Sequence, residues 1–157
     1  MRIDLGGGTA PKAGFVNLDP VHGIGPWKRR AQDIPWPANE EWIREGWKPV
    51  VDAIWASHVM EHIPAGAERI AVFNEAHRVL KPGGTFTVIV PLFPWPQAMA
   101  DPTHVSYWVE ESFGYFDGTC RWGPPNADYG ILPWEHGAWY VRDGWEGTWV
   151  GVKPSHP

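Results

Sequence analysis

The sequence predicts an α/β fold built on an open, mostly parallel sheet. Three observations predict it. A short apolar run leads into a glycine turn, a helical pattern at residues 66–80 follows a buried strand pattern at residues 50–56, and a β-prone run covers residues 85–90. Strands that alternate with helices in this way are typical of parallel sheets. At 157 residues the chain is expected to form a single domain, residues 1–157.

The amino-terminal pattern is a strand, a glycine turn, a second strand and an acid. Residues 2–5 and 15–18 are the expected strands, residues 6–8 are three consecutive glycines, and Asp19 ends the second strand. Glycine lets the backbone bend sharply and lets a ligand approach closely. A carboxylate can accept hydrogen bonds from both hydroxyls of a ribose. The pattern therefore indicates a site for a nucleoside-type ligand.

The link between these strands is short. It runs for nine residues from Gly6 to Gly14 and contains Pro11. A crossover between parallel strands normally needs a dozen residues or more. We therefore expect the first helix of the fold to be absent or reduced to a turn.

The strongest helix pattern lies at residues 66–80. Its apolar residues recur at near-helical spacing, and a Pro-Gly-Gly sequence at residues 82–84 stops it before the strand at residues 85–90. A short helix is also expected at residues 40–45. The expected buried face of the main helix is Ile70, Phe73, Ala76 and Leu80, with Glu68, Arg69 and Glu75 off that face.

The carboxyl half is rich in loops and aromatic residues. The chain has 12 tryptophans and 17 prolines, and many of both follow residue 90. A proline-rich loop is expected at residues 91–106 and a short helix at residues 109–116. Residues 139–141 and 148–150 flank Asp143-Gly144 and predict an antiparallel hairpin. We expect residues 1–92 to form the cofactor-binding core and residues 93–157 the substrate side with flat aromatic surfaces.

Composition narrows the function classes. The net charge of −5 argues against a nucleic-acid binder, and the one basic cluster, residues 28–30, is short. The single cysteine, Cys120, cannot form an internal disulfide. Met1 stands directly before the first strand, so no signal peptide is expected, and no apolar stretch is long enough to span a membrane. We therefore expect a cytoplasmic protein that is not bound to a membrane.

The glycine turn does not fit the dinucleotide or phosphate patterns. A dinucleotide fingerprint needs a third glycine where this chain has Pro11, which disfavours a nucleotide-binding oxidoreductase. The Gly-Lys-Ser/Thr of a phosphate loop is also missing. A turn without any ligand is the remaining alternative, although three glycines are more than a turn requires.

Three motifs in order resemble the class I S-adenosylmethionine-dependent methyltransferases. Residues 4–8 (DLGGG) look like the first motif of that family, and residues 78–84 (RVLKPGG) are similar to its signature before the fifth strand. Residues 51–63 (VDAIWASHVMEHI) resemble the strand and loop between them. In one small branch of the family, the glycine turn is followed by a proline, a glycine and then Asn-hydrophobic-Asp, and residues 11–19 here have the same order.

The resemblance implies a cofactor, S-adenosylmethionine, and a role for each matching residue. The glycines would pass under its methionine portion, Asp19 would hold the ribose, and Asp33 with the Ile34 backbone would lie at the adenine. Ser57 and His58 would face the sulfonium and the substrate. Ala10 replaces a frequent further glycine, which affects cofactor affinity. The implied cofactor-binding residues are Asp4, Gly6, Gly7, Gly8, Asp19, Asp33, Ile34, Ser57 and His58.

The run from His58 to His62 matches His-x-x-Glu-His, a zinc-protease pattern. That chemistry needs both histidines on one long helix, whereas Pro64 ends any helix here at once. We therefore expect no metal, and we expect Glu61 and His62 to cap or stabilise the loop behind the cofactor.

Two histidines are the candidate catalytic residues. His58 follows a strand, and His104 follows the strand at residues 85–90 in the run Asp101-Pro102-Thr103-His104. A histidine has an unperturbed pKa near neutrality and could act as a general base. The alternative is that Asp101 and His104 only hold a turn. Neither Cys120 nor the loop after Ser57 matches the DNA-methylating enzymes, which disfavours DNA as the acceptor.

The expected function is methyl transfer to an oxygen or nitrogen of an unidentified acceptor, a small molecule or sugar. The alternative is a non-catalytic module that keeps the same fold for binding or assembly; exposed tryptophans would then mark its partner surface. A homodimer is also expected, because a site in so small a chain is otherwise uncovered.

Overall fold

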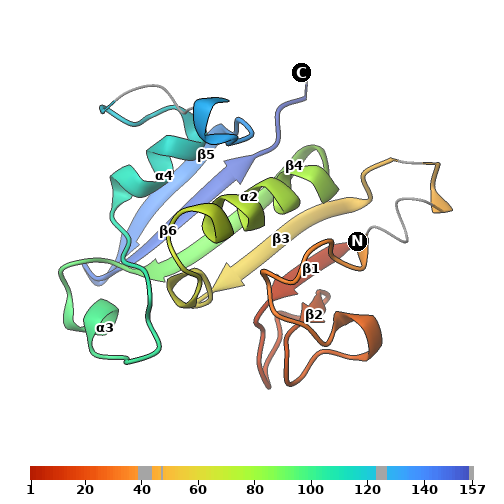
Figure 1. Ribbon diagram of the computed structural model, residues 1–157, viewed down its shortest axis with the longest axis horizontal. Coiled ribbons are helices and arrows are strands. Elements are labelled where there is room, and N and C mark those ends of the chain that lie inside the picture. The colour runs from red at the N-terminus through yellow and green to blue at the C-terminus, as the bar shows by residue number, and fades with distance from the viewer. Residues whose placement is uncertain (39–43, 47, 123–126, 156–157) are drawn as a thin grey trace.

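A single six-stranded sheet organises the molecule (Figure 1). The computed structural model describes residues 1–38, 44–46, 48–122 and 127–155. The strand order is β2-β1-β3-β4-β6-β5, with β2, β1, β3 and β4 parallel and β6 antiparallel to both of its neighbours. The strands are β1 (Arg2–Leu5), β2 (Val16–Leu18), β3 (Val51–Ser57), β4 (Leu80–Pro91), β5 (Glu135–Arg142) and β6 (Glu146–Val152). The predicted mostly parallel sheet with an antiparallel edge hairpin is confirmed.

The helices are short except for one. α2 (Ala67–Val79) connects β3 to β4, and α3 (Pro96–Met99) and α4 (Glu110–Asp117) follow β4. Three single 3-10 turns complete the described elements: η1 (Gly25–Trp27), η2 (Met60–His62) and η3 (Ala127–Tyr129). Most of the helix predicted at residues 40–45, namely residues 40–43, lies outside the described residues. No helix in the described ranges is long and apolar enough to cross a membrane.

The amino-terminal strands pair without a crossover helix. Ile3 pairs with Val16 on one side and with Ile54 on the other, so β1 lies between β2 and β3. Residues 6–15, which connect β1 to β2, contain turns and bends only. The predicted loss of the first helix is therefore confirmed.

Helix α2 packs on one sheet face through an apolar stripe. Phe73 and Ala76 are fully buried, as predicted, and Ile70 is partly buried. Glu75, however, was predicted off the buried face and is only 6% exposed. Its carboxylate accepts the Trp36 backbone N–H at 2.7 Å and pairs with Arg78 at 2.7 Å. A buried glutamate is stable here because both interactions compensate its lost hydration.

Strand β4 begins five residues earlier than predicted. Val51 pairs with Leu80 but Ala53 pairs with Thr85, so β4 carries three extra residues opposite β3. This bulge contains the predicted helix-stopping Pro-Gly-Gly sequence, and Gly83 has a φ of 76° within it. The sequence thus ends α2 and bends the next strand with the same residues.

The core beside β4 and β6 is aromatic. Phe73 stacks on Phe116 of α4 with ring centroids 3.7 Å apart, and Trp149 of β6 lies 5.6 Å from Phe73. Trp108 and Trp134 are also buried. Several tryptophans therefore form core, whereas Trp95 and Trp122 are exposed as expected for this half. Figure 1 shows α2 and α4 on the same face of the sheet.

Candidate active site at the carboxyl edge of the sheet

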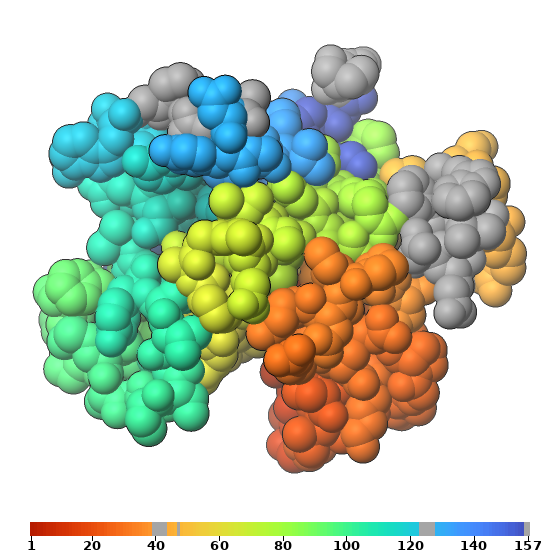
Figure 2. Space-filling view, in the orientation of Figure 1, coloured from red at the N-terminus to blue at the C-terminus, as the bar shows by residue number. Residues whose placement is uncertain are grey.

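The strand ends gather the candidate site residues at one edge. Because β1 to β4 are parallel, their carboxyl ends meet there, and the loops that follow them face one another. Strand β6 is antiparallel, so it begins at this edge, where Glu146 pairs with Pro91. Figure 2 shows a notch at this edge between the amino-terminal residues and the loop after β4, with residues near position 60 at its floor.

The glycine turn is packed against the ends of β2 and β3. The Gly6 N–H donates to the Leu18 carbonyl at 2.7 Å. Gly6 has a φ of 65°, and a Cβ on it would lie 2.5 Å from the Val59 side chain. Gly8 also has a positive φ, of 55°, but the space in front of it is open. Both positions require glycine conformationally, and only Gly8 leaves room beside its Cα.

Polar side chains hold this turn from β1 and β2. The Asn17 amide accepts from the Gly7 N–H and donates to the Gly8 carbonyl, both at 3.1 Å. Asp4 is 4% exposed, and its carboxylate accepts the Lys12 N–H at 2.6 Å. Burial raises the pKa of Asp4, and the hydrogen bond and charge of Lys12 only partly offset this. Asp4 thus fixes the path of the link after the turn.

Asp19 ends β2 and accepts three backbone hydrogen bonds. Its Oδ1 accepts the N–H groups of Val21 and His22 at 2.8 and 2.7 Å, and its Oδ2 accepts the Gly8 N–H at a longer 3.2 Å. Burial opposes ionisation, but these bonds outweigh it, so the pKa of Asp19 lies below its ordinary value. A negative carboxylate therefore lies directly beside the glycine turn.

Two hollows have Gly6 in their walls. One, of about 220 Å³, lies between the turn and the loop after β3, and Pro20, Gln32 and Ile63 line it. The other, of about 380 Å³, is lined by Asp4, Lys12, Trp55 and Ser57. Gly6 lines both hollows. A larger hollow of about 500 Å³ lies beside β2; Gly8 of the glycine turn lines it, but no residue of β3 or of the loop after it does.

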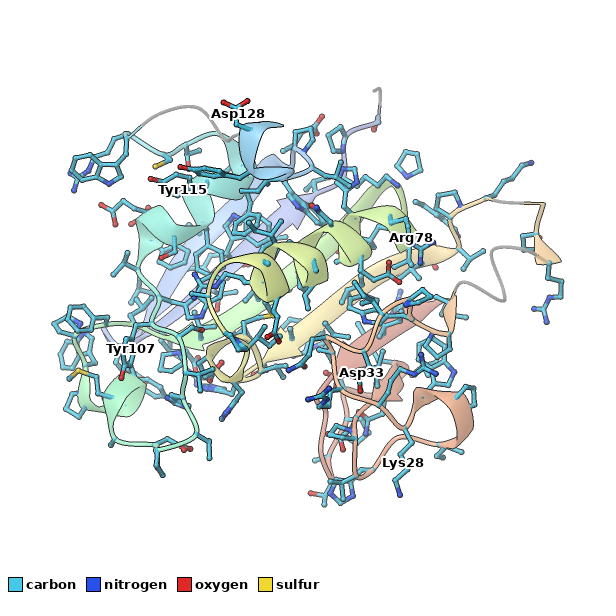
Figure 3. All side chains as sticks on the ribbon, viewed as in Figure 1. Lys28, Asp33, Arg78, Tyr107, Tyr115 and Asp128 are labelled. Atoms are coloured by element: carbon cyan, nitrogen blue, oxygen red, sulfur yellow. The ribbon has the colours of Figure 1, made fainter. Side chains whose placement is uncertain are left out.

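The predicted adenine residues lie beside the smaller hollow. Asp33 forms an ion pair with Arg30 at 2.8 Å, and this pairing lowers the pKa of Asp33. Arg30, Ala31 and Gln32 line the hollow, whereas Asp33 and Ile34 do not. Figure 3 shows Asp33 at the loop that faces the amino-terminal strands.

His58 is held between two carboxylates. Its backbone has a φ of 55°, an uncommon value for a non-glycine residue, and its N–H donates to the Ile89 carbonyl at 2.9 Å. Its Nδ1 lies 3.3 Å from Glu61 and its Nε2 lies 2.9 Å from Glu146. The close approach of the Glu61 carboxylate is the largest cause of a raised His58 pKa; burial opposes it and Glu146 adds to it.

Glu61 also connects His58 to the second predicted catalytic histidine. The Nε2 of His104 lies 4.0 Å from Glu61, and its Nδ1 lies 2.9 Å from the Ala98 carbonyl. The two histidines are 46 positions apart in the chain, and the structure brings them to the same buried carboxylate. Ser57, in contrast, faces the hollow with Asp4 and Lys12.

Sequence reasoning missed three contributors to this edge. Glu146 had no signal, because its approach to His58 depends on the antiparallel register of β6. Lys12 had none either, since its position over the Trp55 ring, at 3.7 Å, depends on the path of the link. Asn17 did have a signal, because it is part of the Asn-hydrophobic-Asp run.

Residues 47–88 match the family model of a methyltransferase domain. The chain is therefore similar to methyltransferase domains over β3, α2 and most of β4. Its sheet, with the glycine turn after β1 and an acid after β2, is the fold expected from the resemblance. No curated protein sequence matches the chain.

Solved structures show the same fold over nearly the whole chain. A chain from the complex of the Haloferax volcanii Trm112 methyltransferase activator with a methyltransferase matches with a TM-score of 0.61 at 15% identity, covering 99% of this chain and 82% of that one. The Burkholderia thailandensis 1,6-didemethyltoxoflavin-N1-methyltransferase, solved with S-adenosylhomocysteine, matches with a TM-score of 0.61 at 12% identity, covering 98% and 70%. An Aquifex aeolicus SAM-dependent methyltransferase gives 0.55 at 12% identity, covering 97% and 81%.

Proposed function

We propose that this methyltransferase domain transfers a methyl group from S-adenosylmethionine to an oxygen or nitrogen of a small molecule or sugar. The observation that supports this most strongly is the pair of hollows that share Gly6 as a wall residue, with the Asp19 carboxylate beside the same turn. A nucleoside attached to an amino acid has two parts of different chemistry, and two hollows of different character on either side of the glycine turn suit it.

The smaller hollow suits the adenosine portion. Leu18, Pro20 and Ile63 give it apolar walls. The open space at Gly8, which lines the hollow beside β2, lets a ligand pass close to the backbone of the turn. The long 3.2 Å bond from Gly8 to Asp19 is the one that a ribose hydroxyl would join or replace. Asp33 and Ile34 follow the wall residues Arg30 to Gln32, which supports their predicted place at the adenine.

The larger hollow suits the methionine portion. A free amino acid end carries a carboxylate and an ammonium group. The ammonium of Lys12 and the carboxylate of Asp4 line this hollow and offer the two opposite charges. Gly7 and Ser57 complete the same wall. Asp4 therefore both fixes the link and presents charge to the ligand.

His58 is the proposed base for an acceptor that must lose a proton. A sulfonium already activates the methyl group, so the remaining task of the protein is to align donor and acceptor and to exclude water. His58 is 42% exposed at the notch, and Glu146 orients its ring. Since a base must be neutral and the His58 pKa is raised, methyl transfer should increase as pH rises through that pKa. His104, only 8% exposed, stays a predicted second candidate.

The second candidate function is the non-catalytic module. The contacts of Asp19 favour this function, because its two oxygens already accept three backbone hydrogen bonds and are thus partly occupied without a ribose. We further propose that a protein partner binds this domain, because one structural neighbour comes from a complex with the Trm112 methyltransferase activator. An Asp19→Asn variant separates the two: an enzyme should lose donor binding and turnover, whereas a module should keep its partner.

The proposed function is tested by incubating the full chain with S-adenosylmethionine and small-molecule fractions, and measuring S-adenosylhomocysteine by mass spectrometry. We expect acceptor-dependent product, at least about 10-fold less product with Asp19→Asn, and less product with His58→Gln, because charged hydrogen bonds contribute about 1.5–3 kcal/mol. Lys81→Gln, at the opposite edge of the sheet, should act like wild type. Equal product from wild type and Asp19→Asn would contradict the proposal.

A further inference from the structure

Three side chains from two separate loops converge beside the proposed site. Glu61 and His62 belong to η2, and His104 lies in the loop between α3 and α4. One ligand atom from each lies within 4.8 Å of the others. The loop is fixed to η2, because the N–H groups of Val105 and Ser106 donate to the Glu61 carbonyl at 2.9 and 3.1 Å. The cluster is therefore held by the backbone and does not depend on a chance side-chain contact.

Glu61 is a buried carboxylate without a well-aligned hydrogen-bond donor. Its side chain is 1% exposed, and within the described residues neither carboxylate oxygen takes part in a hydrogen bond of good geometry. The nearest polar groups are imidazole nitrogens, His58 Nδ1 at 3.3 Å and His104 Nε2 at 4.0 Å. A buried carboxylate is costly when its nearest donors are only two imidazoles in poor hydrogen-bond geometry, and a bound cation would compensate it more fully.

The hydrogen bonds of the two histidines leave one lone pair of each ring free. His104 Nδ1 lies 2.9 Å from the Ala98 carbonyl, which can only accept, so Nδ1 carries the proton and the lone pair of the neutral ring is on Nε2. His62 Nδ1 lies 3.2 Å from the Thr103 carbonyl. The Thr103 hydroxyl donates to Asp101 at 2.6 Å, so toward His62 it can only accept. Metal-binding histidines almost always donate their other ring N–H in this way.

We propose that Glu61, His62 and His104 bind one divalent transition-metal ion, with zinc as the test ion. Two imidazoles and a carboxylate are a common donor set for zinc and for iron(II), and three protein ligands leave a position open. His62 is exposed, so solvent can reach the cluster. Ligand atoms around zinc lie roughly 3.3 Å apart at bond lengths near 2.0–2.1 Å. The 4.8 Å cluster must therefore contract slightly, which the exposed His62 ring allows.

This site differs from the zinc pattern in the sequence, and it departs from the expectation that no metal binds. The pattern pairs His58 with His62, but His58 instead lies between Glu61 and Glu146. His104, from outside the pattern, takes its place. The consequence for the reaction rests on the proposed function: a cation here would bind an oxygen of the acceptor beside His58, which favours acceptors with a hydroxyl or carbonyl group.

Metal binding is tested on the full chain after chelator treatment, without any methyl donor, by calorimetry with Zn²⁺ and by the visible absorption of Co²⁺. We expect one ion per chain, with Glu61→Gln and His104→Ala each weakening affinity at least about 10-fold. Thr103→Val keeps all three ligands and should weaken affinity less. His136→Gln, which removes an imidazole bound to Asp117 elsewhere, is the matched control.

The outcomes separate this proposal from the proposed function. Circular dichroism of the metal-free variants shows whether each one folds. If Glu61→Gln does not fold, the comparison of wild type with Thr103→Val and His104→Ala still decides the test. No binding at about 100 μM Zn²⁺, or equal affinity in wild type, Thr103→Val and His104→Ala, would overturn the metal site. The metal titration contains no methyl donor. Failure of S-adenosylmethionine to bind in a separate titration would therefore leave the result for the metal unaffected.

Discussion

At the scale of single residues, the site is a set of charges placed by backbone geometry. The positive φ of His58 turns its ring away from the path of β3 and toward Glu146. Asp19 remains negative beside the glycine turn because backbone N–H groups stabilise its charge. Neither effect comes from the residue type alone; each depends on where a strand ends.

The pKa of His58 is a direct readout of this arrangement. Titration by NMR should give a value above 6.5, since Glu61 and Glu146 both stabilise the imidazolium. A group whose pKa is raised on folding stabilises the fold fully below its unfolded pKa of about 6.5, and that stabilisation is lost as pH rises through the folded value. Glu146→Gln removes one carboxylate and should lower the His58 pKa. An unchanged pKa in this variant would show that the contact at 2.9 Å does not form in solution.

At the scale of elements, α2 connects the sheet to the aromatic core. Phe73 lies against Phe86 of β4 at 5.2 Å, Phe116 of α4 at 3.7 Å and Trp149 of β6 at 5.6 Å between ring centroids. One side chain thus joins three elements. The other side of the helix faces solvent at Glu68, so the two faces of α2 should respond very differently to substitution.

Phe73→Ala should lower the free energy of unfolding by about 3–5 kcal/mol, because it opens a cavity in a fully buried cluster. Glu68→Gln, on the exposed side of the same helix, should change it by less than about 1 kcal/mol. Urea denaturation followed by far-UV circular dichroism measures both. If the two variants were equally stable, the aromatic cluster would not be the core of this domain.

Element positions were largely predictable, and their interactions were not. The strands at residues 2–5 and 15–18 and the helix at residues 66–80 were found within about one residue, because hydrophobic period and glycine punctuation determine them locally. The buried Glu75 could not be foreseen, since its partner Trp36 is 39 residues away. For the same reason the glycine turn could be predicted as a candidate site, whereas Glu146 could not.

At the scale of the whole molecule, one face of the sheet has the long helix and the other does not. α2 and α4 pack on the face that carries Phe86 and Trp149, as Figure 1 shows. The opposite face, with Trp55 and Thr87, has neither helix against it. It is half-buried, and Lys12 of the short link lies over the Trp55 ring. The predicted homodimer stays a prediction.

The missing first helix has a consequence for the cofactor. A helix beginning at the glycine turn would add backbone N–H donors and a favourable dipole at the ligand. This domain has the turn, Asp19 and the two hollows but not that helix. We therefore expect it to bind its cofactor more weakly than a domain with the full crossover would.

Calorimetry with S-adenosylhomocysteine tests the central claim most directly. We expect the full chain to bind one molecule with a submillimolar Kd, and Asp19→Asn to weaken binding at least about 10-fold while Glu68→Gln leaves it unchanged. Asparagine keeps one carbonyl oxygen for the Val21 and His22 N–H groups, so the variant should still fold. Absence of binding by the wild-type chain at about 1 mM ligand would contradict the assignment of this edge as a methyl-donor site.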